Sequence, residues 1–179
     1  MKCLLCGKSL QTEISFTNLL CFKKEEEIVC ESCISSFESI GGNHCPSCFK
    51  KGMSIICQDC QFWCKKGVKV DHVALYSYNQ AMKEYFSRYK FDGDYLLRKV
   101  FSEILQKELK KYKDYQIVIV PLSDHRLKSR GFNQLEGLIK DTGLAYLDIL
   151  VKKEVEASSS KNRSDRLLAE FPFLKQLGQ

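Results

Sequence analysis

Ten cysteines are the residues of this 179-residue chain whose types and spacing most clearly indicate chemistry. Eight of them form four pairs with two residues between the partners: Cys3 and Cys6, Cys30 and Cys33, Cys45 and Cys48, and Cys57 and Cys60. Zinc takes four thiolates tetrahedrally, and a two-residue gap lets both sulfurs of one turn converge on a single ion. The four pairs therefore predict two structural Zn²⁺ sites.

Sequence leaves the pairing of these turns open. Joining consecutive turns closes shorter loops than a crossed arrangement and is the favoured prediction. Cys64 can replace Cys60 at the second site, whereas Cys21 lies in the apolar "LLCF" and is expected in a core. His44 adjoins Cys45, which already fills that ligand position, so we do not expect it to bind the metal. Closed sites of this kind are structural and leave no coordination position for catalysis.

A second candidate site follows the apolar stretch "YQIVIVP" (115–121). The chain then carries Arg126, Lys128 and Arg130, and Gly131 follows them directly. In open α/β sheets, ligands bind outside the carboxyl ends of the strands, and arginines clamp anions through two parallel hydrogen bonds. We therefore expect a loop that binds an anion, although a basic loop that only meets solvent explains the same composition.

The elements that must position these residues fall into two domains, a double zinc ribbon at 1–66 and an α/β domain at 67–179. The second domain is expected to hold strands at 70–79, 115–121 and 144–153. Helices are expected around 82–89 and 97–112, and a short one capped by Asn133 ends at Gly143. Alternation of strands with helices predicts a layer built on a parallel sheet.

Composition and charge indicate which classes of binding partner the chain favours. The chain is 44% hydrophobic and carries a net charge of +6, of which residues 67–179 contribute +5. That excess suits phosphates or nucleic acid, although a solvated surface is the commoner explanation. No apolar run approaches the ~20 residues that cross a bilayer, and "MKCLLCGKSL" is unlike a secretory signal. We expect a cytoplasmic protein.

Several motifs of this sequence resemble those of the ComF family of competence proteins: "CLLCG", the four CxxC turns and above all "VPLSDHRLKSRGFNQ". The resemblance implies a double zinc ribbon followed by a type I phosphoribosyltransferase-like domain, in proteins associated with the uptake of transforming DNA. It also implies a helicase-like, DNA-dependent ATPase as a partner. The residues that match the family's motif are Arg126, Arg130, Gly131, Phe132, Asn133 and Gln134. "SSSKNRSDRL" takes the place of a second family segment and adds Lys161, Asn162, Arg163 and Arg166 as candidates of lower rank.

The chain departs from this family at the loop that grips phosphoribosyl pyrophosphate. No adjacent acidic pair followed by "TTG" occurs in the sequence, and "KDTGL" (140–144) lacks both the acidic pair and a preceding strand. Only three strands are expected after Gly67, fewer than the usual four to six. We therefore expect an incomplete transferase-like domain, truncated at its C-terminus.

The sequence and the family resemblance leave two alternative functions. The first is a competence protein that holds single-stranded DNA and docks the ATPase, with a transferase-like domain that is inactive in this chain. The alternative is an active phosphoribosyltransferase, in a full-length form, that uses Mg²⁺ and an amine or base acceptor. Phe62, Trp63, Lys65 and Lys66 are the clearest aromatic and basic cluster for DNA, although a hydrophobic seam between the domains is the favoured interpretation.

Overall fold

The computed structural model describes residues 1–10, 27–153, 162, 165 and 173–175. The chain divides into two compact units, Met1–Ser87 (unit 1) and Arg88–Gln179 (unit 2), and each is described by itself. The division into domains 1–66 and 67–179 stays a prediction. Within the described part of the chain, no helix is both long enough and apolar enough to span a membrane.

Unit 1 contains α2 (Glu31–Ile34), α3 (Gln58–Lys65) and most of α4 (Gln80–Phe91). Cys30 and Cys57, each in extended conformation, immediately precede α2 and α3. Each of these helices therefore starts within one of the CxxC turns. In α3, Asp59 lies in the first turn and Lys65 in the last, which is the charge order that the helix dipole favours.

A small aromatic core lies beside the cysteines in unit 1. Phe37 is buried and meets Tyr76 and Tyr85 edge-on, with ring centroids 6.2 and 6.1 Å apart. Asn79 accepts a hydrogen bond from the Met82 amide at 3.0 Å and donates to the Ser36 carbonyl at 2.8 Å. It thus caps α4 and ties that helix to the segment after α2.

The strand expected at 70–79 is reduced to one antiparallel bridge, between Ser39 and Tyr76. Two backbone hydrogen bonds flank it, from the Ile40 amide to the Leu75 carbonyl at 3.0 Å and from the Ser77 amide to the Glu38 carbonyl at 2.8 Å. The short pairing joins the segment between Cys33 and Cys45 to the chain that enters α4.

Unit 2 is built on helices that pack around a buried centre. The helix expected at 97–112 forms as three consecutive pieces, which are the 3₁₀ helix η1 (Tyr95–Phe101), α5 (Ser102–Leu109) and the 3₁₀ helix η2 (Lys110–Tyr112). Helix α7 (Gln134–Lys140) packs on η1 and α5. The buried hydrophobic side chains of unit 2 are Tyr89, Leu97, Val100, Phe101, Ile119, Leu138 and Ile139.

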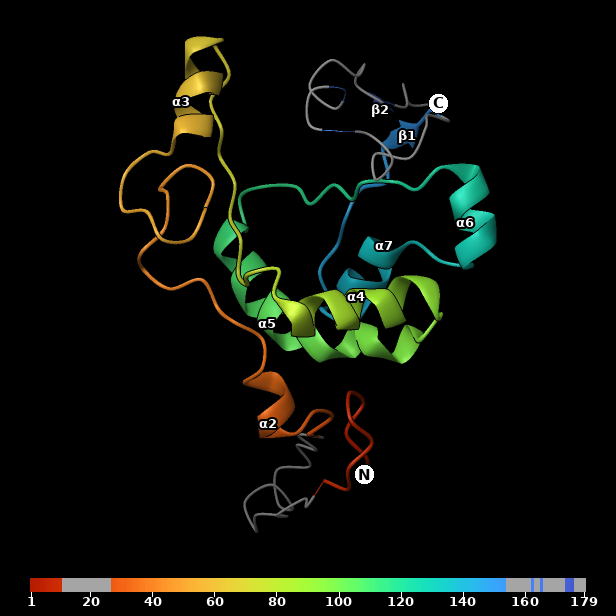
Figure 1. Ribbon diagram of the computed structural model, residues 1–179. Helices are drawn as coiled ribbons and strands as arrows, with labels where there is room; N and C mark the ends of the chain where they lie inside the picture. Colours follow the sequence, from red (N-terminus) through yellow and green to blue (C-terminus); the bar gives the residue numbers. More distant parts are fainter. Residues whose placement is uncertain (11–26, 154–161, 163–164, 166–172, 176–179) are drawn as a thin grey trace. The chain divides into compact units, whose positions relative to one another are not determined.

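The strands of unit 2 are short. A parallel bridge joins Val118 to Leu147, and the Leu147 amide donates to the Ile117 carbonyl at 2.8 Å. The two segments expected as neighbouring parallel strands therefore meet at one point. β1 (Leu150–Lys152) and β2 (Phe173–Lys175) pair antiparallel, with Val151 opposite Leu174 (Figure 1). The expected mixed α/β class is confirmed, whereas the regular sheet described for residues 150–152 and 173–175 is antiparallel.

Candidate functional site

The eight paired cysteines gather into two groups of four. Cys3, Cys6, Cys30 and Cys33 form the first thiol cluster, and Cys45, Cys48, Cys57 and Cys60 form the second. Within each cluster the four sulfurs lie within 4.8 Å of one another. This is the consecutive pairing of turns that the shorter loops favour.

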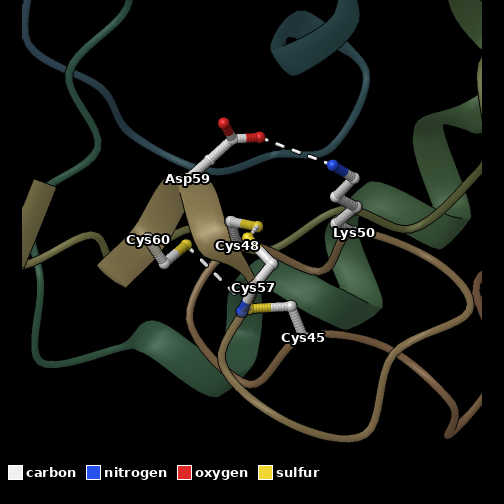
Figure 2. A network of polar contacts seen from close by, with 6 residues as sticks. All are labelled: Cys45, Cys48, Lys50, Cys57, Asp59 and Cys60. Carbon is white, nitrogen blue, oxygen red and sulfur yellow. Dashed lines mark hydrogen bonds and ion pairs between the residues drawn. The ribbon is translucent and has the colours of Figure 1, made fainter. Parts of the chain in front are cut away.

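The sulfur spacing tests whether zinc fits. A tetrahedral ion with Zn–S bonds near 2.3 Å separates its sulfurs by about 3.8 Å. In the first cluster, Cys6 and Cys30 are 3.7 Å apart. In the second, the separation is 3.9 Å between Cys45 and Cys60 and 3.7 Å between Cys48 and Cys57. Figure 2 shows the second cluster converging from a loop and the start of α3. Both clusters are compatible with one structural zinc ion each.

The thiols within one cluster differ in pKa. The Ser32 hydroxyl and a backbone hydrogen bond lower the pKa of Cys30 to about 6, whereas burial and the neighbouring sulfurs raise the pKa of Cys33 to about 12. In the second cluster, burial opposes ionisation of Cys45, but backbone hydrogen bonds lower its pKa to about 6. Burial raises the pKa of Cys60. Four thiolates therefore do not coexist at neutral pH without a cation between them.

The remaining candidate ligands lie outside these clusters. The His44 ring stacks on Phe49 with centroids 3.9 Å apart, and its Nδ1 lies 3.1 Å from the Cys45 carbonyl. Cys64 is exposed and belongs to neither group. Cys21 lies outside the residues that the structure describes. That His44 does not bind the metal stays a prediction.

The surface of α3 next to the second cluster carries the aromatic and basic residues singled out in the sequence. Phe62 and Trp63 meet edge-on, and the Lys66 ammonium lies 4.6 Å from the centre of the Phe62 ring. Phe62 remains 45% exposed. Lys50 and Asp59 form a 3.4 Å ion pair on the same module (Figure 2), and its exposure makes its contribution to stability small.

The basic segment after 115–121 is a helix, α6 (Asp124–Arg130), and the expectation of a loop is wrong. Ser123 precedes it in extended conformation, and Lys128 and Arg130 occupy its last turn, where the helix dipole favours cations. Gly131 ends it in the left-handed conformation with φ of 82°, and its amide donates to the Leu127 carbonyl at 2.8 Å. Glycine adopts this geometry at least cost.

The residues after α6 connect the motif to the core of unit 2. Phe132 packs on Tyr89 and Tyr95, with ring centroids 5.2 and 4.9 Å away. Asn133 caps α7 by accepting from the Leu135 amide at 3.0 Å, and its side-chain nitrogen lies 3.4 Å from the Val120 carbonyl. The capping role predicted for Asn133 is confirmed. Phe132 and Asn133 thus fix the position of the basic helix.

Four cations lie on or near this helix. Arg126 and Lys128 are exposed, and within the described part of the chain neither forms an ion pair. Arg130 is half-buried beside the Phe91 ring, 5.9 Å from its centre, and donates to the Gln134 side-chain oxygen. Burial and Arg126 lower the pKa of Arg130, and burial and Arg130 lower the pKa of Lys90. Besides burial, these shifts reflect cations that lie close to one another.

Lys90 is the member of this group that sequence reasoning missed. It lies on α4, within a stretch interpreted only as a core stripe. The only sequence signal was a lysine between Tyr89 and Phe91, in a stretch whose aromatic residues pointed to a core. Arg163, Lys161 and Arg166 lie outside the described residues. Asn162 accepts a hydrogen bond from the Asp165 amide at 2.9 Å.

No family model matches the chain, and no solved structure matches it. A curated protein named Competence protein ComFC from Streptococcus pneumoniae is 56% identical over 178 residues, covering 99% of this chain and 81% of that protein. A protein of the same name from Bacillus subtilis is 31% identical over 179 residues, covering 96% of this chain and 74% of its own length.

Proposed function

Because this chain belongs to the ComF family of competence proteins, we propose that it binds single-stranded DNA during the uptake of transforming DNA. The observation that carries the proposal is the cationic group on and near α6, in which Arg126 and Lys128 are exposed and Arg130 lies half-buried beside the Phe91 ring. Besides burial, the charge of Arg126 lowers the pKa of Arg130, and that of Arg130 lowers the pKa of Lys90. A phosphate diester placed there relieves that repulsion. Phosphate contacts supply most of the affinity of proteins for single strands.

The geometry supports a phosphate rather than a flat apolar ligand at this point. Arg126 and Arg130 are one helical turn apart on α6, so their guanidinium groups can approach the same anion. Arginine presents paired donors that match two phosphate oxygens. Phe132 and Asn133 hold the end of the helix against the core, so the donors need little ordering when the strand binds.

The other parts of the proposal concern the zinc module and the transferase-like domain. The two thiol clusters build a rigid module whose exposed Phe62 suits contact with a protein partner, which we take to be the DNA-dependent ATPase. Unit 2 acts as a phosphoribosyltransferase-like domain without the pyrophosphate-gripping loop, since the acidic pair and "TTG" are absent from the sequence. In this proposal its role is to hold nucleic acid.

The test removes charge from α6. The variant Arg126→Gln/Arg130→Gln is titrated against a fluorescently labelled oligothymidylate and followed by fluorescence anisotropy. We expect binding roughly tenfold weaker per arginine, because a hydrogen bond to a charged group contributes about 1.5 kcal/mol or more. The matched control, Lys99→Gln, removes one exposed charge from η1 and should bind almost as the unaltered protein does. Equal affinity in both variants would place the DNA elsewhere.

A further inference from the structure

Unit 2 contains a cavity that the cationic group on α6 does not explain. Its volume is about 390 Å³, within the range of about 300 to 1,000 Å³ typical of small-ligand sites. The wall consists of the end of the helical run and the beginnings of the two segments that meet in the parallel bridge at Val118 and Leu147. The residues that line this tyrosine cavity are Leu109, Lys110, Tyr112, Lys113, Tyr115, Gln116, Ile117, Leu144, Ala145, Tyr146 and Leu147.

Two tyrosine rings at the cavity remain open to solvent. Tyr115 is 75% exposed and Tyr112 is 40% exposed, although Tyr112 was expected on the buried stripe of a helix. Their ring centroids lie 6.1 Å apart and the rings meet edge-on at 74°. An edge-on pair leaves ring faces available, and aromatic faces are what nucleobases stack on in single-strand binding proteins.

The lysines at the cavity have no ion-pair partner in the part of the chain that the structure describes. Lys110 and Lys113 line the wall and are exposed, and among the described residues neither has an ion-pair partner. Lys111, in contrast, pairs with Glu108 at 2.6 Å. Burial and the carboxylates of Glu136 and Asp148 raise the pKa of Tyr146, so negative charge lies near this part of the wall and disfavours an anion there. An anion is therefore favoured only beside Lys110 and Lys113.

A ligand that complements this arrangement has a flat apolar ring and a negative charge beside it. We propose that the tyrosine cavity seats a base of single-stranded DNA, with Tyr112 and Tyr115 stacking on bases and Lys110 and Lys113 contacting the adjoining phosphates. This rests on the proposed function. It adds a contact that recognises bases, which the cations of α6 do not supply, and so explains how the protein can distinguish an exposed single strand from a duplex whose bases are stacked inside.

The test replaces the aromatic rings of Tyr112 and Tyr115 by apolar side chains that have no ring face. The variant Tyr112→Leu/Tyr115→Leu is titrated with labelled oligothymidylate beside the matched control Tyr112→Phe/Tyr115→Phe. Stacking on one base contributes enough that the leucine variant should bind about tenfold more weakly, whereas the phenylalanine variant should bind as the unaltered protein does. Replacing Lys110 and Lys113 by Gln should make the fall of log affinity with log salt shallower, by roughly 0.7 in slope for each lysine. An oligonucleotide containing bromodeoxyuridine should photo-crosslink to Tyr115.

The outcomes separate this inference from the proposed function. If the unaltered protein binds the strand and the leucine variant binds equally well, with an unchanged circular dichroism spectrum, the tyrosine cavity is not a DNA site and the proposed function stands. Crosslinks confined to α6 would overturn the inference in the same way. If the unaltered protein fails to bind the strand at low salt, the proposed function itself fails.

Discussion

Replacing Gly137 by alanine should destabilise unit 2, although alanine is the better helix former. Gly137 lies in α7, and a methyl group there would overlap the hydroxyl oxygen of Tyr89 and lie 3.1 Å from Cε2 of Tyr95. The Tyr89 ring cannot swing away, because it is fully buried, packs on Phe132 and donates from its hydroxyl to the Gln134 carbonyl at 2.9 Å. The absence of a side chain at Gly137 therefore makes room for the ring that holds the motif.

The magnitude follows from opposing effects. Exchanging glycine for alanine inside a helix favours folding by about 1 kcal/mol. Overpacking a filled core costs about 1 to 3 kcal/mol, and displacing the Tyr89 hydroxyl from its acceptor costs about 1 kcal/mol more. We expect Gly137→Ala to lower the free energy of unfolding of unit 2 by about 1 to 3 kcal/mol.

Urea denaturation followed by far-UV circular dichroism measures this change, and hydrogen exchange of the η1 and α7 amides assigns it to unit 2. The double variant Tyr89→Phe/Gly137→Ala is the control. Without the hydroxyl, the next atom of the Tyr89 ring lies 3.5 Å from the added methyl group, an ordinary contact. Most of the loss should therefore disappear in the Tyr89→Phe background. A Gly137→Ala protein as stable as the unaltered one would refute the packing described here.

Three further predictions concern other parts of the molecule. Elemental analysis should find two zinc ions per chain, one for each thiol cluster; Cys45→Ser should lower this content, while Cys64→Ser should not, and equal content in both variants would contradict the ligand assignment. Calorimetric titration of this chain with phosphoribosyl pyrophosphate and Mg²⁺ should give no heat of binding, because residues 1–179 contain no acidic pair followed by "TTG"; saturable heat would contradict this expectation. Asn79→Ala should destabilise unit 1 by about 1 kcal/mol, because it removes the cap of α4; Asn79→Asp, which keeps the acceptor for the Met82 amide, should retain most of that stability in thermal unfolding, and equal losses would argue against the cap.

The thiol clusters could be predicted because their signal is local. Two cysteines separated by two residues already lie in one turn, so only the choice of partner turn was open. The helix around Met82, Tyr85 and Tyr89 was equally readable, since these residues recur at helical spacing and all three are buried in α4. The Asn133 cap followed from its place before an apolar repeat.

The basic helix could not be predicted from periodicity, because "DHRLKSR" has no apolar stripe. Its signals were at its ends, in Ser123 and Gly131, and the charged interior outweighed them. Tyr112 was expected in a core because it continued the apolar spacing of 97–109. The change to a 3₁₀ turn at Lys110–Tyr112 alters that spacing and leaves the ring exposed. The tyrosine cavity depends on this local change, which the sequence pattern does not report.

In the proposed function, the cations of unit 2 contact the phosphates of single-stranded DNA directly. The measurement that tests it most directly is the affinity of the zinc-loaded protein for oligothymidylate across a salt series. We expect log affinity to fall linearly with log salt, with a slope of about −0.7 for each phosphate contacted. Affinity that does not change with salt, or no binding at the lowest salt, would contradict it.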